Sequence, residues 1–139
     1  LLCIVSAINL VKLLTVESQS NVNVFNLIGD LYSIINIDDW VKEYIFWELK
    51  LLEIVGFNLQ LNKIAKSELI NNEKKYFVGS NSEKKYIPNF LIDRDEKKLD
   101  KKTLSKALKL VGDFLEKNVL KPNNIGYPNS RLEFVNLFK

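Results

Sequence analysis

The sequence of 139 residues contains no histidine, no methionine and only one cysteine, Cys3. A lone cysteine cannot form a disulfide within the chain, and a cysteine flanked by apolar residues is usually a small core residue. Without histidine, the commonest zinc sites, the Ser-His-Asp and Cys-His nucleophile systems and histidine acid–base catalysis are excluded. Catalysis would have to use carboxylates and lysines, so we expect a protein that binds rather than an enzyme, with no cofactor and no metal.

Glycine is also scarce, and none of the five glycines stands in a phosphate-binding context such as G-x-x-x-x-G-K. The acidic "DRDE" (Asp93 to Glu96) lacks the glycine and the spacing of a calcium loop, which favours a solvated linker. The opening "LLCIVSAINLVKLL" lacks a basic start, and Asn9 and Lys12 interrupt it. It therefore predicts a buried helix rather than a signal peptide or membrane span. The absence of methionine and this helical opening indicate a fragment or processed product of a longer protein.

The net charge of +3 is unevenly distributed along the chain. Residues 1–59 hold three lysines and seven acidic residues, for a net −4, whereas residues 60–139 hold seventeen basic and ten acidic residues, for a net +7. A basic C-terminal portion indicates an anionic partner such as nucleic acid or an acidic peptide. An AT-rich genome would also enrich Lys, Asn and Ile, so the charge leaves both explanations open.

Apolar residues at helical spacing predict a bundle of helices. The predicted helices cover about residues 1–15, 22–35, 40–55, 101–120 and 131–139, with the polar segment Glu17–Asn21 as a loop. Asp38 or Asp39 can cap the third helix, and Gly56 can end it. The closing segment offers Leu132, Phe134, Val135 and Phe138 for burial.

The third helix is apolar around most of its circumference, so we expect it to be central. Glu48 lies on its apolar side. A buried carboxylate usually has a cationic or backbone partner, so Glu48 is either a satisfied structural acid or a functional group.

A different pattern occupies about residues 60–92. "YFV" (Tyr76 to Val78) is typical of a short strand, "GSNS" (Gly79 to Ser82) of a turn, and "KYIPNFLI" (Lys85 to Ile92) of an extended segment. The predicted fold class is mainly α, a helical bundle with a small irregular or β insert at about residues 60–92.

Lysines of the long helix lie away from its apolar stripe of Leu104, Leu108, Val111, Leu115 and Val119. They form a candidate DNA-binding ridge of Lys102, Lys106, Lys109, Lys117 and Lys121. Lysines on phosphates give weak, salt-sensitive binding that is independent of base sequence. A solvated helix face is the alternative explanation.

The order of four segments resembles the C-terminal helical part of the RecO family of bacterial recombination mediators. The segments are "VFNLIGDLYSI", "FWELKLLEIVGFNLQLNKIA", "YIPNFLI" and "LVGDFLEKNVLKPNNIGYPNSRLEFVNLF", which together cover most of residues 20–139. Many relatives have a cysteine-rich insert where this chain has Ile64 and Ser67, so we expect one domain over 1–139 with a degenerate, metal-free insert. The family's N-terminal OB-fold has no counterpart in this sequence.

The resemblance implies a cytoplasmic, non-enzymatic protein of DNA repair and homologous recombination. Such proteins bind single-stranded DNA and the acidic, Phe-ended tail of single-strand binding protein, partner RecR and help to load RecA. A stand-alone helical interaction or scaffold domain without a nucleic-acid role is the alternative.

Arg131, in "NSRLEF", matches an arginine of the family's closing element, a region that helps to receive the tail. A guanidinium can hold a terminal carboxylate through two hydrogen bonds while apolar neighbours receive a Phe. Leu115, Leu132 and Val135 are the predicted pocket residues. In the alternative interpretation, Arg131 caps or pairs near the short helix.

Overall fold

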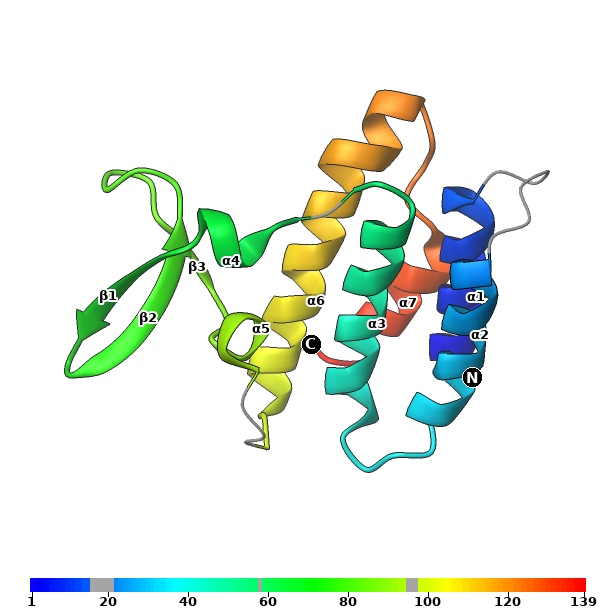
Figure 1. The fold of residues 1–139 in the computed structure, drawn as a ribbon, viewed down its shortest axis with the longest axis horizontal. Helices are drawn as coiled ribbons and strands as arrows, with labels where there is room; N and C mark the ends of the chain where they lie inside the picture. The colour runs from blue at the N-terminus through cyan, green and yellow to red at the C-terminus, as the bar shows by residue number, and fades with distance from the viewer. Residues whose placement is uncertain (16–21, 58, 95–97) are drawn as a thin grey trace. The chain divides into compact units, whose positions relative to one another are not determined.

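The computed structural model describes residues 1–15, 22–57, 59–94 and 98–139 (Figure 1). It confirms the predicted fold class, because helices dominate and the strands form one small sheet. The chain forms two compact units, a helical unit of Leu1–Leu59 with Leu99–Lys139 and an insert unit of Gln60–Lys98. The predicted loop Glu17–Asn21 and the last two residues of the predicted linker Asp93–Glu96 lie outside the described residues.

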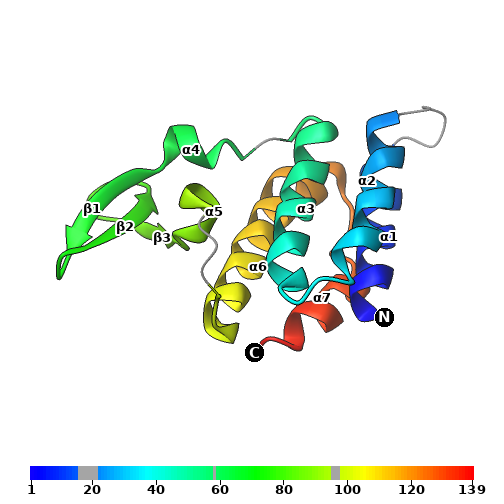
Figure 2. The same ribbon diagram turned by 60° about the horizontal axis from the view of Figure 1, so that its bottom comes forward.

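The helical unit contains five of the described α-helices, with α3 at its centre (Figures 1 and 2). Helix α3 contacts α1, α2 and α6, while α7 packs on α1 and α6. The elements of this unit are α1 (Leu2–Leu14), α2 (Val22–Ile34), α3 (Trp40–Ile54), α6 (Lys101–Leu115), the π-helix η1 (Glu116–Leu120), the 3-10 turn η2 (Lys121–Asn123) and α7 (Asn129–Asn136).

Helix α3 is the central helix, as its sequence predicts. It buries one broad face of apolar and aromatic side chains together with Glu48, and most of its other apolar residues are half-buried. The indole Nε1–H of Trp47 donates to the carbonyl of Leu27 on α2 at 2.7 Å. The helix ends where predicted, because Gly56 adopts a φ of 97° that costs glycine little. The N–H of Phe57 then donates to the carbonyl of Leu52 at 2.7 Å, which completes a Schellman motif.

The long helix near the C-terminus is composite. Residues Lys101–Leu115 are α-helical, and the predicted helical segment continues as η1 rather than as a regular α-helix. Leu108, Val111, Leu115 and Val119 are buried, which confirms most of the predicted stripe, while Leu104 is half-buried.

The insert unit is a three-stranded antiparallel sheet in the order β1-β2-β3 with two helical turns. Its elements are α4 (Leu61–Ile64), β1 (Lys66–Ile70), β2 (Glu73–Val78), β3 (Lys85–Ile87) and α5 (Phe90–Asp93). The predicted strand at Tyr76–Val78 is part of the longer β2, and β1 was not predicted. Asn71 and Asn72 join β1 to β2 with φ values of 52° and 66°, the positive values that a type I′ hairpin turn requires. The prediction of a continuous extended segment over 85–92 is wrong, since Pro88 ends β3 and α5 follows.

The two caps of the helical unit differ and provide a matched test of local stability. Asp100 accepts a hydrogen bond from the N–H of Thr103 at 2.8 Å at the start of α6, whereas Asp39 occupies the N-cap position of α3 without a side-chain cap bond. We expect Asp100→Ala to lower the free energy of unfolding by about 1 kcal/mol. Asp39→Ala, measured by the same urea titration, should cost less, and equal losses would contradict the role of the cap.

Candidate functional site

Arg131 and Glu48 are the two charged residues buried among the described parts of the chain, with 1% and 2% of their areas exposed. They form a bidentate ion pair between α7 and α3. The Nε–H of Arg131 donates to Oε2 of Glu48 at 2.9 Å, and an Nη2–H donates to Oε1 at 2.7 Å. Two parallel bonds of this kind are the strongest arrangement that a guanidinium and a carboxylate can make.

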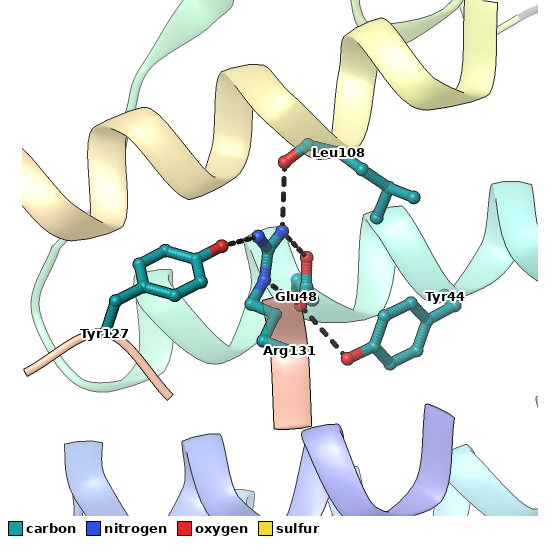
Figure 3. Close-up of polar contacts among 5 residues, drawn as sticks. All are labelled: Tyr44, Glu48, Leu108, Tyr127 and Arg131. Carbon is teal, nitrogen blue, oxygen red and sulfur yellow. Dashed lines mark hydrogen bonds and ion pairs between the residues drawn. The ribbon is translucent and has the colours of Figure 1, made fainter. Parts of the chain in front are cut away.

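Three further groups complete a polar cluster around this pair (Figure 3). Arg131 also donates to the backbone carbonyl of Leu108 on α6 at 3.0 Å and to the hydroxyl of Tyr127. The hydroxyl of Tyr44 donates to Oε2 of Glu48 at 3.0 Å. The guanidinium therefore links α3, α6 and α7 with the segment that precedes α7.

A glycine on α6 makes room for the guanidinium. A Cβ added at Gly112 would lie 2.6 Å from Nη1 of Arg131 and 2.8 Å from the hydroxyl of Tyr127. Real Cβ atoms do not approach other atoms this closely, and both neighbours are held by the cluster. Gly112 is thus needed for a close approach of a side chain to the backbone of α6.

The protonation of the cluster follows from its burial and charges. Burial by itself lowers the pKa of the Arg131 guanidinium. The negative charge of Glu48 and the hydrogen bonds to it outweigh burial, so the pKa is raised overall. Burial raises the pKa of Tyr44 well above its ordinary value, and the charge of Glu48 adds to this. Burial likewise raises the pKa of Tyr127. Both phenols stay neutral, with the hydroxyl of Tyr44 donating to Glu48 and that of Tyr127 accepting from Arg131, so the cluster is a satisfied structural network.

Glu48 therefore has the cationic partner that its place on an apolar face predicts, and this confirms the structural interpretation of that carboxylate. Arg131 pairs within the chain, as in the alternative interpretation in which it caps or pairs near the short helix. A role of Arg131 in holding a partner's carboxylate stays a prediction, and in this structure four hydrogen bonds of its guanidinium are made within the chain.

The predicted pocket residues lie in different environments. Leu115 belongs to the core of α6. Leu132 on α7 is 47% exposed, so the prediction that it is available for burial in the bundle is wrong. Val135 is half-buried. Phe134 is the α7 residue that fills the core, and its ring lies 5.1 Å from that of Tyr44 in an edge-to-face contact.

All five predicted DNA-binding lysines are exposed. Lys102, Lys106 and Lys109 belong to α6, Lys117 to η1 and Lys121 to η2. Asp113 is exposed at helical spacing between Lys109 and Lys117, and Lys121 lies 3.9 Å from a carboxylate oxygen of Glu116. The lysine row of these five residues is thus basic but interrupted by acidic groups.

The described residues contain no group of three or more His, Cys, Asp or Glu side chains that could hold a metal ion. None of their helices is long and apolar enough to cross a membrane.

The buried pair predicts strongly coupled mutations. Arg131→Met alone leaves Glu48 buried without its cation, and we expect it to lower the free energy of unfolding by about 3–5 kcal/mol. The double variant Arg131→Met/Glu48→Leu removes both charges and should lose much less than the sum of the single losses. Urea unfolding followed by the fluorescence of Trp40 and Trp47 measures the cycle, and additive losses would refute the coupling.

The sequence of the chain is similar to those of known proteins. The family model described as "Recombination protein O C terminal" matches residues 1–124, a range that ends before α7. The DNA repair protein RecO of Rhodospirillum centenum is 22% identical over 148 aligned positions, which cover 96% of this chain and 58% of that protein. The DNA repair protein RecO of Rhodospirillum rubrum is 30% identical over 108 positions, covering 69% of this chain and 43% of the relative.

The DNA repair protein RecO of Bartonella henselae is 27% identical over 107 positions, which cover 67% of this chain and 41% of the relative. The chain thus spans about half the length of these curated relatives. No solved structure matches the chain significantly. Since the family model covers most of the sequence, the chain belongs to the recombination protein O (RecO) family and corresponds to its C-terminal domain.

Proposed function

We propose that this chain acts in DNA repair and homologous recombination by binding single-stranded DNA, without catalysing a reaction. The observation that carries the proposal is the lysine row, because all five side chains along α6, η1 and η2 are exposed to solvent. The relatives are named DNA repair proteins, which supports a nucleic-acid partner over a generic solvated face. Flexible ammonium groups contact phosphates without reading bases, so binding is salt-sensitive and independent of sequence.

The proposed function also includes protein partners. RecO-type mediation in the cytoplasm, with RecR and with RecA loaded indirectly, follows from the family resemblance. The acidic tail of single-strand binding protein has a candidate receiving surface on α7, where Leu132 and Val135 leave apolar area uncovered. Helix α1 packs against α7, and Asn9 of α1 donates to the Ser130 hydroxyl at 2.8 Å.

Because Arg131 is buried, substituting it does not separate the loss of tail binding from the loss of the fold. Arg131→Ala would leave Glu48 unpaired in the core, so a failure of that variant to bind the peptide could result from unfolding alone. Exposed residues of α7 give a cleaner test, because surface substitutions usually change stability by less than about 0.5 kcal/mol.

Charge reversal tests the lysine row. We expect Lys106→Glu/Lys109→Glu to weaken binding of a fluorescent thymidine oligonucleotide and to reduce the salt dependence, by about 0.7 in the log–log slope for each phosphate that is no longer neutralised. Fluorescence anisotropy at several salt concentrations measures both effects. The control Lys12→Glu/Lys50→Glu makes the same charge change at exposed positions of α1 and α3. Equal losses of affinity in the two variants, or no binding by the unmutated chain, would refute the assignment and favour a scaffold domain.

The surface of α7 is tested with a labelled peptide that ends in Asp-Asp-Ile-Pro-Phe. Leu132→Ser should weaken peptide binding about fivefold or more, as expected when an interaction worth about 1 kcal/mol is removed. Leu69→Ser, at an exposed leucine of the insert unit, serves as the control and should bind normally. Tight binding by Leu132→Ser would exclude this surface, and no binding by the unmutated chain would exclude the tail as a partner.

A further inference from the structure

The insert unit contains a basic, aromatic face that the proposed function does not use. Its 39 residues, Gln60–Lys98, hold nine basic and six acidic residues, for a net +3. The helical unit holds eleven of each sign. The whole net charge of the chain therefore belongs to the small insert.

The pairing of the strands defines which side chains share a face. Lys66 of β1 pairs with Phe77 of β2, and Phe77 pairs with Tyr86 of β3, so these three side chains form one row across the sheet. Lys84, just before β3, reaches the same face, since its Nζ lies 4.7 Å above the ring of Phe77. The ring of Phe77 is itself buried, with 4% of its area exposed, so Tyr86 is the exposed ring of this row. The opposite face carries Tyr76, also buried, whose hydroxyl donates to Asp93 of α5 at 2.6 Å.

Tyr86 is held in place although 48% of its area is exposed. Its hydroxyl donates to Oε1 of Glu68 at 2.7 Å, and its ring makes an edge-to-face contact with Phe77 at 6.3 Å. An exposed aromatic ring with a fixed orientation offers a flat surface for stacking at low entropic cost.

Glu68 lies on this face as well, and the ion pair with Lys84 offsets its negative charge. Its Oε2 accepts from Nζ of Lys84 at 2.5 Å, so both carboxylate oxygens have partners. The hydrogen bonds from Lys84 and Tyr86 lower the pKa of Glu68, and the bond to Glu68 raises the pKa of Tyr86. At neutral pH the carboxylate is ionised and the phenol is a neutral donor, which keeps the bond intact.

We propose that the face of Lys66, Phe77, Lys84 and Tyr86 binds single-stranded nucleic acid, with a base stacked on Tyr86 and Lys66 beside a backbone phosphate, while Phe77 and Lys84 hold Tyr86 and Glu68 in place. An exposed aromatic ring beside a basic side chain is a usual means of holding a single strand without reading its sequence. An acidic peptide would use the charges but has no need of the exposed ring. This second contact rests on the proposed DNA binding and extends it to the insert unit.

The test compares variants of the full chain in binding a thymidine oligonucleotide. Tyr86→Leu removes the ring and should weaken binding about fivefold or more, the lower end of what one stacked base contributes. Tyr86→Phe keeps the ring and should retain most of the affinity. Lys66→Glu should weaken binding more than Lys63→Glu, which makes the same charge change on α4 of the same unit.

Photo-crosslinking locates the base directly. An oligonucleotide with 5-iodouracil should crosslink to Tyr86, as identified by mass spectrometry. Unchanged affinity of Tyr86→Leu, equal effects at Lys63 and Lys66, or a matched acidic peptide that competes with the same dependence on Tyr86 would overturn the proposal. If the α6 variants lose affinity while Tyr86→Leu does not, only the insert contact falls. If the unmutated chain binds no DNA, both proposals fall.

Discussion

The buried ion pair between Arg131 and Glu48 fixes the arrangement of the helical unit. Removing two charges from water costs several kcal/mol for each ion, so α7 is stable only where the guanidinium meets the carboxylate and its other acceptors together. Those acceptors come from α6 and from Tyr127. A shift of α7 by one residue would leave unpaired charges in the core, which makes the pair a determinant of register as well as of packing. The outward position of Leu132 follows from that register.

Arg131 and the lysines of the lysine row are used differently. Arg131 is buried because a planar fork can satisfy several acceptors at once, whereas a lysine would bring a single point charge to the same place. The lysine row on α6, η1 and η2 needs no such geometry for the proposed DNA binding, since solvated ammonium groups can follow a flexible strand of phosphates. The same helix therefore has a buried face that accepts from Arg131 through the carbonyl of Leu108 and an exposed face that is basic.

Much of this fold could be predicted from the sequence, because helical periodicity reports burial directly. The spacing of apolar residues identifies α1, α2, α3 and α6, and Gly56 marks the end of α3. The pairing of Glu48 with Arg131 could not be predicted, since 83 residues separate them and no local pattern joins them. Glu48 on an apolar face was the available signal that a cation must be nearby. Strand β1 was missed because its pairing depends on the turn at Asn71 and Asn72, and Asn-Asn is a weaker signal of a type I′ turn than Asn-Gly.

The distribution of charge between the two units determines the range and the salt dependence of the proposed DNA binding. The helical unit is neutral overall, so the proposed contacts of its lysine row with phosphates are local rather than the effect of a long-range field, and Asp113 and Glu116 weaken even these. The insert unit adds a net positive charge and an oriented ring. Contacts of both kinds are tolerant of sequence and weakened by salt. Several weak, separable contacts permit stepwise release of a bound strand where one deep, specific site would not.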